Sequence, residues 1–394
     1  MEIKVIATTN FGHIAEKEEF EKMAGLTAGV CYLSNTIDEL FLESEIKTMN
    51  RTNSIKESGH HSPFDHPFIN LEINDIPKII AMYINNEKVY TTSEKSARYR
   101  RMELEGEEKE YYNKWLEIFK QKIADRYQEK YPEIFGETAI KKLAQENARY
   151  LTSVFTPTSM VYSVSYRQIN ILYSIIAKEI DIVSKRNDPF SIRLKVELEK
   201  FNQELEKTGY IDEKLSKNVK NRYASFVKRD IRPVVKYFGD VYCSEYKGSF
   251  AQLAQAQRHR TLNYTAQIPN VDEMEFYVPP ILKDDENLVS EWKEDCKKLA
   301  NNYPQATLID ITEMGTLDDF ILKTKERLCK HAQLEIDQQT ALTLKEYYKE
   351  LKANNHPRAE EVEKYTHGSR CTFPDYKCTN PCKFPEGVTG ERKI

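Results

Sequence analysis

Glycine is scarce in this chain, and the sequence lacks the glycine-rich loop that cradles phosphates in many nucleotide-binding proteins. Only 13 of the 394 residues are glycine. None of them forms the closely spaced pattern that opens a doubly wound dinucleotide-binding domain. A dinucleotide would therefore have to bind by a different mechanism.

The chain also lacks long apolar runs, a secretory signal and an excess of positive charge. No apolar stretch approaches the roughly 20 residues of a membrane span. The N-terminal stretch MEIKVIATTNFGHIAEKEEF turns polar and acidic at once. The net charge of -4 gives no overall basic field for nucleic acid. We therefore expect a cytoplasmic protein that binds neither membrane nor nucleic acid.

The cysteines do not follow the pattern of a disulfide-stabilised protein, because the seven cysteines are an odd number. Four of them stand singly in the sequence, at Cys31, Cys243, Cys296 and Cys329. Cys371, Cys378 and Cys382 lie in a tail rich in proline and glycine, with His367 just upstream. Their spacing is not the CxxC pair of many zinc sites, so two interpretations stay open: a structural metal site, or an irregular tail without metal.

The order of the predicted elements indicates an α+β fold in which helices dominate. A length of 394 residues exceeds one ordinary core and fits two domains. Strands are predicted at residues 4–9, 68–73 and 240–245. Helices are predicted at residues 76–90, 107–131, 140–149, 160–183, 192–207, 214–237, 249–260, 287–301 and 317–351. The loop KTGYID gives a boundary between an N-terminal half, residues 1–210, and a C-terminal half, residues 211–394.

Three histidines and an aspartate stand within the segment GHHSPFDH, from Gly59 to His66. Imidazole and carboxylate groups clustered in this way suit zinc or iron. The alternative is a turn before a strand, in which the histidines cap the turn and form hydrogen bonds. The segment by itself is compatible with both interpretations.

Two basic segments have the chemistry of anion-binding sites. In the first, Ser96 and Arg98 stand two residues apart, and a hydroxyl together with a guanidinium can grip a phosphate. In the second, Arg258 and Arg260 flank His259 and place fixed positive charge around a titratable ring, which suits an anionic planar ligand. The alternatives are a solvated basic turn and a basic helix end.

A third segment carries Arg327, His331 and Glu335 at helical spacing. Residues four apart lie on one face of a helix, so these three side chains are predicted to share a face. They form either part of a site or an ion-pair stripe on the surface.

These segments together resemble the flavin-dependent thymidylate synthases. In that family, a Gly-His element with a Phe and a second His precedes a strand and a helix that ends in Arg-His-Arg. Ser-x-Arg-Tyr follows seven residues later. An Ala-Arg pair, a long apolar helix and an Arg before His-Ala-Gln-x-Glu-Ile come further on. The resemblance implies the fold of the thymidylate synthase-complementing proteins, as two related helix-rich domains, each with a small sheet, that form a pseudo-dimer in one chain.

The two halves keep complementary parts of this pattern. The N-terminal half keeps GHHSPFDH, Ser96–Tyr99 and Ala148-Arg149, but it has Asn86-Glu87-Lys88 in place of Arg-His-Arg and Ile176 in place of the later Arg. The C-terminal half keeps GSFAQLAQAQRHR, FYVPP and RLCKHAQLEI, but it has Ile268 in place of the Ser of Ser-x-Arg-Tyr. We expect a composite site, to which each half contributes what the other has lost.

The resemblance implies a role for each retained residue. The substrate dUMP would be bound by Gln255, Arg258, Ser96, Ala97, Arg98, Arg149 and Arg327. FAD would be held or bordered by His60, Ser62, Glu94, Arg258, His259, Arg260 and His331. Arg327 would also be catalytic, because it would polarise the uracil ring. No metal is expected in the active site, since the flavin carries the redox step.

The resemblance also implies the reaction and the assembly. The family converts dUMP to dTMP, with a carbon from methylenetetrahydrofolate and a hydride from reduced FAD, which NADPH regenerates. It acts as a homotetramer whose sites lie where subunits meet, so the fused chain is expected to form a homodimer. Two alternatives stay open. One is a related flavin-dependent enzyme that modifies a pyrimidine nucleotide differently, for example by hydroxymethylation, and the other is a non-catalytic nucleotide-binding homologue.

Overall fold

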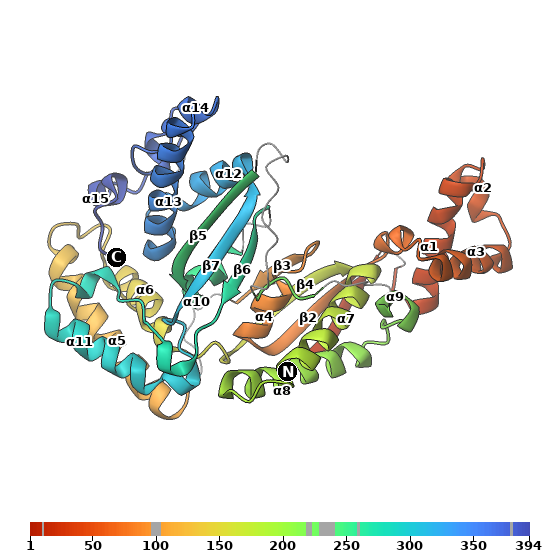
Figure 1. Ribbon diagram of the computed structural model, residues 1–394, viewed down its shortest axis with the longest axis horizontal. Helices are drawn as coiled ribbons and strands as arrows, with labels where there is room; N and C mark the ends of the chain where they lie inside the picture. The colour runs from red at the N-terminus through yellow and green to blue at the C-terminus, as the bar shows by residue number, and fades with distance from the viewer. Residues whose placement is uncertain (10–11, 96–103, 218–222, 228–240, 258–260, 379–380) are drawn as a thin grey trace. The chain divides into compact units, whose positions relative to one another are not determined.

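The chain forms two compact units in the computed structural model, which describes residues 1–9, 12–95, 104–217, 223–227, 241–257, 261–378 and 381–394 (Figure 1). Unit 1 consists of residues 1–95 and 157–225. Unit 2 consists of residues 96–156 and 226–394. Among the described helices, none is long and apolar enough to cross a membrane.

The two units do not follow the linear order of the sequence. Residues 96–156 lie in the N-terminal half of the chain but pack with residues 226–394. The division of the chain into two compact units is therefore different from its division into two family-like halves. The boundary at residue 210 stays a prediction about those halves.

Unit 1 is built on a four-stranded antiparallel sheet with the strand order β1-β2-β4-β3. Its strands are β1 (Glu2–Thr8), β2 (Phe68–Pro77), β3 (Thr91–Glu94) and β4 (Pro157–Ser165). Ile69, Leu71 and Ile73 are buried and alternate with more exposed residues along β2, as expected for a strand with one face in the core. The strands predicted at residues 4–9 and 68–73 are confirmed.

The helices of unit 1 pack along this sheet, and α1–α3 form a small lobe at one end of the unit (Figure 1). They are α1 (Lys17–Tyr32), α2 (Ile37–Phe41), α3 (Glu45–Ser58), α4 (Lys78–Ile84), α7 (Tyr166–Val183), α8 (Pro189–Lys207) and α9 (Glu213–Lys217). Helix α7 begins where the Ser165 side chain accepts a hydrogen bond from the backbone N–H of Gln168. Helix α8 begins after Asp188, with Pro189 in its first turn.

Unit 2 is built on a three-stranded antiparallel sheet with the order β5-β7-β6. Its strands are β5 (Val241–Ser249), β6 (Asn263–Gln267) and β7 (Leu308–Thr316). Its helices are α5 (Gly106–Ile123), α6 (Glu137–Ala148), α10 (Phe250–Ala256), α11 (Glu286–Lys298), α12 (Leu317–Arg327), α13 (Leu334–Ala353), α14 (Ala359–Glu363) and α15 (Pro385–Thr389). The strand predicted at residues 240–245 is confirmed as the start of β5.

An aromatic core joins the two sequence segments of unit 2. Trp115 and Phe119 come from α5, and Trp292 comes from α11. The rings of Trp115 and Trp292 meet edge to face, with their centroids 4.8 Å apart, and all three side chains are fully buried. Burying a large aromatic side chain contributes roughly 1.5–3 kcal/mol. This core explains why residues 96–156 belong to unit 2.

The two sheets share one topology. Three strands in each follow the spatial order first, third, second: β2-β4-β3 in unit 1 and β5-β7-β6 in unit 2. The first and third of these strands lead directly into helices, which are α4 and α7 in unit 1 and α10 and α12 in unit 2. The sequences of the two units can therefore be aligned at the residues that cap the equivalent helices.

The prediction of a single helix over residues 160–183 is wrong in its first part. Residues up to Ser165 form β4, and the helix begins at Tyr166. Met160, Tyr162 and Val164 are buried in alternation, a period of two that fits a strand between β2 and β3. Because residues 160–183 are predominantly apolar, the change from the period of a strand to that of a helix was not visible in the sequence.

The prediction of one helix over residues 317–351 is also wrong, because α12 ends at Arg327 and α13 begins at Leu334. The helix predicted from Pro77 ends at Ile84 and is not amphipathic, since every residue from Ile79 to Ile84 is buried. Of the helix predicted at residues 214–237, the described part is α9, residues 223–227 are not helical, and the remainder lies outside the described residues. Strands β3, β6 and β7 were not predicted.

Candidate functional site

The predicted site residues fall into three groups in the structure. Arg149, Gln255, Arg327 and His331 lie in unit 2, and His60, Ser62 and Glu94 lie in unit 1. The remaining predicted residues lie outside the described residues: Ser96, Ala97, Arg98, Arg258, His259 and Arg260.

A buried carboxylate connects three segments of unit 2. Glu335, in the first turn of α13, accepts hydrogen bonds from the hydroxyl of Tyr150 at 2.7 Å and from the hydroxyl of Ser249 at 2.6 Å. It also accepts a hydrogen bond from the backbone N–H of Ser249 at 2.8 Å. Burial raises the pKa of Glu335, although its hydrogen bonds and the positive charge of Arg149 oppose that shift. Glu335 thereby fixes the positions of Arg149 and of the residue that caps α10.

Arg149 is 6% exposed and lies next to Tyr150 in a 3₁₀ turn that follows α6. The hydroxyl of Tyr150 also accepts a hydrogen bond from the side-chain amide of Gln333. Burial raises the pKa of Tyr150 well above its usual value, and the negative charge of Glu335 adds to the shift. Tyr150 is therefore a neutral hydroxyl that links Gln333 to Glu335. The sequence offered one signal for this network, since Gln333 and Glu335 belong to the motif that was singled out, but nothing in it indicated Tyr150 or Ser249.

Gln255 and Arg327 meet at the ends of two helices. Gln255 lies in the last turn of α10, and Arg327 is the last residue of α12. A guanidinium nitrogen of Arg327 donates to the backbone carbonyl of Gln255 over 3.5 Å. Both polar atoms of the Gln255 side chain are buried without a hydrogen-bond partner among the described residues. A buried amide that lacks a partner is costly unless a ligand supplies one, so this pair has the character of a binding site.

The turn that carries His331 is held by a single arginine. Arg392 is 2% exposed and donates to the backbone carbonyls of Lys330 at 3.1 Å and Ala332 at 2.9 Å. The same guanidinium contacts the carboxylate of Asp337 at 3.1 Å. These carbonyls lie in the gap between α12 and α13, so Arg392 provides the physical reason for the break in the predicted helix. No motif of the sequence indicated this contact.

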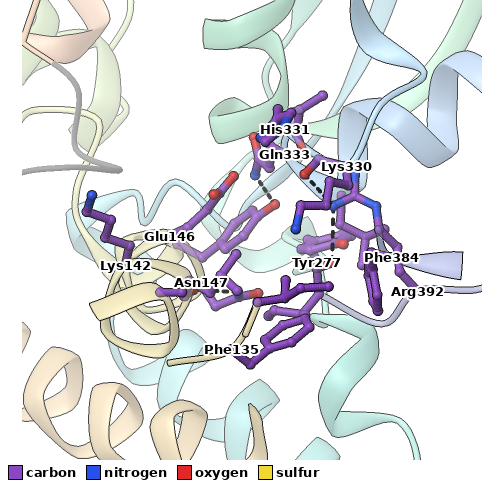
Figure 2. Close-up of a pocket in the computed structure, with 17 residues that line it drawn as sticks. Phe135, Lys142, Glu146, Asn147, Tyr277, Lys330, His331, Gln333, Phe384 and Arg392 are labelled. Atoms are coloured by element: carbon purple, nitrogen blue, oxygen red, sulfur yellow. Dashed lines mark hydrogen bonds between the residues drawn. The ribbon is translucent and has the colours of Figure 1, made fainter. Parts of the chain in front are cut away.

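A cavity of about 240 Å³ lies beside this turn (Figure 2). The aromatic part of its wall includes Tyr150 and Tyr277, whose rings stack with centroids 4.8 Å apart. Its polar part includes His331 and Gln333, and the side-chain oxygen of Gln333 is buried without a hydrogen-bond partner among the described residues. Figure 2 shows His331 and Gln333 together on one side of this cavity.

The histidine-rich segment of unit 1 forms a turn. Ser62 opens the 3₁₀ turn Ser62–Asp65, and His60 follows Gly59, the residue that caps the end of α3. The buried ring of His61 lies 2.9 Å from the backbone carbonyl of Lys56. Asp65 pairs with Arg167 at 2.8 Å. The segment thus has the turn and the histidine hydrogen bond of the turn interpretation. No group of three His, Cys, Asp or Glu side chains among the described residues is arranged to hold a metal.

Glu94, at the end of β3, is paired with a lysine. The ammonium of Lys78 lies 2.5 Å from its carboxylate, and the Glu94 side chain is 2% exposed. The negative charge of Glu94 is therefore balanced within unit 1.

Equivalent positions of the two units differ in chemistry at the end of the third strand. Helix α7 follows the cap residue Ser165, and α12 follows the cap residue Thr316. Counted from these caps, Ile176 is equivalent to Arg327. Ile176 is 1% exposed and belongs to the core of unit 1.

In unit 1, the residues equivalent to the Arg-His-Arg segment form hydrogen bonds with another part of the chain. Counted from the caps of α4 and α10, which are Pro77 and Ser249, Asn86-Glu87-Lys88 is equivalent to residues 258–260. Glu87 is 1% exposed and accepts hydrogen bonds from the backbone N–H of Ser225 at 2.6 Å and from its hydroxyl at 2.8 Å. The side-chain amide of Asn86 donates to the same hydroxyl at 2.9 Å. In unit 1, Ser225 of the same chain therefore contacts the side chains at this position.

Comparisons with known proteins bear on these motifs. Residues 14–179 match the sequence model of the family described as Thymidylate synthase complementing protein. No curated protein matches the chain. Thymidylate Synthase X (ThyX) from Helicobacter pylori, solved with FAD and dUMP, is 15% identical with a TM-score of 0.33, and the match covers 56% of this chain and 98% of that chain. The UMP/dUMP methylase PolB from Streptomyces cacaoi, bound with 5-Br dUMP, is 15% identical with a TM-score of 0.30, and the match covers 44% of this chain and 76% of that chain.

The family match spans the segment GHHSPFDH, residues 96–99 and Arg149. It confirms the resemblance predicted from these motifs. The resemblance of residues 211–394 lies outside the match and stays a prediction. Over residues 14–179, the chain thus resembles the thymidylate synthase complementing proteins, and this match covers less than half of its 394 residues.

Proposed function

We propose that the chain is an FAD-dependent thymidylate synthase that converts dUMP to dTMP, with methylenetetrahydrofolate as the carbon donor and NADPH as the reductant. The composition of unit 2 is the observation that carries this proposal. Residues 96–156, which include the phosphate-binding elements of the family, share one compact unit with residues 226–394, which include Gln255, Arg327 and His331. Unit 2 thus combines the Ser-x-Arg and Ala-Arg elements kept by one half with the elements kept by the other, whereas the Gly-His element lies in unit 1.

The phosphate of dUMP is bound, in this proposal, by Ser96, Arg98 and Arg149. A phosphate dianion requires several convergent donors, and arginine provides two parallel ones. Arg149 is buried, and a buried charge is screened less by salt than an exposed one. Arg258 adds a further positive charge from the C-terminal half.

The uracil ring is recognised by Gln255 and Arg327. The Gln255 amide offers a donor and an acceptor, and a uracil edge presents the matching acceptor and donor. Arg327 donates to a uracil carbonyl and stabilises the negative charge that develops as C5 becomes nucleophilic. The unpartnered polar atoms of the Gln255 side chain support a ligand at this position.

FAD is held by His259, Arg260 and His331, and it supplies the hydride of the reaction when bound. His60, Ser62 and Glu94 border it in the assembled enzyme. The turn fixed by Arg392 holds the backbone on both sides of His331, which keeps this ring in place. No nucleophilic side chain is required, and the cysteines of the chain have no assigned part in the reaction.

The shared topology of β2-β4-β3 and β5-β7-β6 supports a tandem of two family-like halves. The positions that face ligands in the second half are buried core positions in the first, at Glu87 and Ile176. We therefore assign the nucleotide-binding chemistry to unit 2 and a structural role to these positions of unit 1.

The test is turnover of dUMP by the purified full-length chain, with methylenetetrahydrofolate and NADPH, and with the product identified by mass. The expected result is a yellow protein that forms dTMP. A hydroxymethylated product would support the related enzyme instead. A colourless protein that takes up no added FAD and consumes no dUMP would support the alternative of a non-catalytic nucleotide-binding homologue.

A further inference from the structure

Four of the seven cysteines line one cavity of unit 2. This cavity, of about 490 Å³, is called the thiol pocket here, and its cysteines are Cys329, Cys371, Cys378 and Cys382. The other three cysteines lie elsewhere: Cys31 and Cys243 are exposed and Cys296 is buried. The gathering of the tail cysteines around Cys329 is a property of the tertiary structure, because Cys329 stands far from them in the sequence.

Backbone hydrogen bonds bring these thiols together. The N–H of Arg370 donates to the carbonyl of Leu328 at 2.7 Å, which sets Cys371 beside Cys329. The N–H of Ser369 donates to the carbonyl of Val388 at 3.2 Å, which joins the two ends of the tail. One of these hydrogen bonds thus joins the tail to the turn between α12 and α13, and the other joins two parts of the tail to each other.

The chemistry of the pocket favours a thiophilic metal. Thiolate sulfur is a soft ligand that selects zinc, copper(I) or iron, and four thiolates form a closed tetrahedral zinc site. The side chains of Lys330 and Arg370 also line the pocket. No disulfide joins any of the four.

With the side chains as they stand, no three metal-binding groups of the described residues form a ligand set. Each cysteine has a single side-chain torsion before its sulfur, with three staggered positions, so the sulfur positions can change without movement of the backbone. We propose that Cys329, Cys371, Cys378 and Cys382 bind one structural zinc ion in the thiol pocket.

This metal site lies next to residues that are proposed to bind ligands in unit 2, but it takes no part in the proposed reaction. Cys329 stands between Arg327 and His331 in the turn that Arg392 holds. A metal bound to Cys329 and to the tail fixes this turn from a second side. The zinc proposal rests on the thiols alone and does not depend on the reaction proposed above.

The experiment is elemental analysis of the full-length protein, purified without chelators, together with Cys→Ser variants. About one zinc ion per chain is expected, as for a closed four-thiolate site. Cys329→Ser, Cys371→Ser, Cys378→Ser and Cys382→Ser are each expected to lose most of it, whereas Cys31→Ser and Cys243→Ser retain it. Zinc release from the unaltered protein, followed with a chromogenic chelator during titration with a mercurial reagent, tests the same point without any variant.

Three results would overturn the proposal. The first is a protein without zinc that also takes up none from added zinc chloride under reducing conditions. The second is full zinc content in Cys329→Ser, because the fourth ligand would then lie elsewhere. The third is iron with acid-labile sulfide in place of zinc, which would make the pocket a cluster site.

Discussion

Ile176 and Arg327 occupy equivalent positions of the two units and have opposite chemistry. The isoleucine is buried in the core of unit 1. The arginine ends α12, where its guanidinium contacts the backbone of Gln255. A single position thus serves packing in one unit and, in the proposed function, ligand recognition in the other, and mutations at the two copies should differ accordingly.

Arg327→Ala and Arg98→Ala are each expected to abolish most turnover of dUMP. An arginine removed from a charge-assisted contact costs about 2 kcal/mol or more, which is roughly a 30-fold loss. Lys88→Ala and Ile268→Ala, at the positions without family residues, should change kcat/KM only slightly. Steady-state kinetics of the four variants checks this. Inactivity of Lys88→Ala together with normal activity of Arg258→Ala would mean that the first half holds a site of its own.

Glu87 presents the converse case, a buried carboxylate that stabilises unit 1. Glu87→Ala leaves the backbone N–H of Ser225 without its acceptor, whereas the Ser225 hydroxyl keeps a second acceptor in the backbone carbonyl of Asn86 at 3.2 Å. The expected loss is about 1–3 kcal/mol of unfolding free energy, with no change in dUMP affinity once the protein is folded. Denaturant unfolding and dUMP titration measure the two quantities. A large drop in dUMP affinity at unchanged stability would instead place Glu87 in a binding site.

At the scale of elements, the break between α12 and α13 decides where Arg327 and His331 lie. One continuous helix would put them on one face, as the spacing predicted. The observed turn separates the two residues into a helix end and a loop. The guanidinium of Arg392 holds that loop by its carbonyl groups.

Arg392→Leu should therefore be strongly destabilising and should also weaken flavin binding. The change leaves the buried carboxylate of Asp337 without its partner, and breaking one side of a buried ion pair costs roughly 3–5 kcal/mol. Arg126→Leu is the matched control, because its partner Asp284 is largely exposed and surface pairs contribute about 1 kcal/mol or less. Thermal unfolding and FAD titration provide the readouts. Equal effects of the two substitutions would contradict the role given to Arg392.

The helical lobe of unit 1 is tied to α9 by a charge cluster with a defined pH dependence. Asp212 lies 2.9 Å from the ammonium of Lys17 in α1 and 3.1 Å from that of Lys56 in α3. Burial acts to raise the pKa of Asp212, but the two lysines outweigh it and lower this pKa from 3.8 to about 2. A lowered pKa stabilises the folded state above pH 3.8, and that stabilisation is lost as the pH falls toward 2.

Asp212→Asn should remove this acid sensitivity. The unaltered protein is expected to lose about 2 kcal/mol of unfolding free energy between roughly pH 4 and pH 2 through this group. The variant should be less stable at neutral pH by a similar amount, and flatter in the acid range. Asp284→Asn, at an exposed position, serves as the control. Parallel pH profiles for the two variants would remove the assignment to Asp212.

At the scale of the whole molecule, the complementary losses predict an assembly. Each family-like half carries only part of a site, and the proposed flavin residues are divided between unit 1 and unit 2. We therefore expect the chain to act as a homodimer, in which four family-like portions replace four subunits. Light scattering should give twice the mass of one chain, 46.2 kDa, at the concentrations used in the assay. A fully active monomer would exclude the dimer but leave the reaction itself untouched.

The sequence by itself determined the resemblance to the family over residues 14–179 and the set of predicted functional residues. Ser96–Tyr99, Ala148-Arg149 and the segment around His331 are short and contiguous, so their recognition needs no knowledge of distant contacts. The same holds for strand β2, whose period of two is visible in its own residues. Helix starts at Ser165 and Ser249 follow from local hydrogen bonds of the cap residues.

Only the tertiary structure decided which segments share a core. Residues 96–156 pack with the C-terminal part through Trp115 and Trp292, Glu335 joins Ser249 to Tyr150, and Cys329 meets the tail cysteines in the thiol pocket. Each of these contacts links residues far apart in the chain. Periodicity and capping report only on the neighbours of a residue, whereas burial and long-range hydrogen bonding depend on what the folded chain places opposite it.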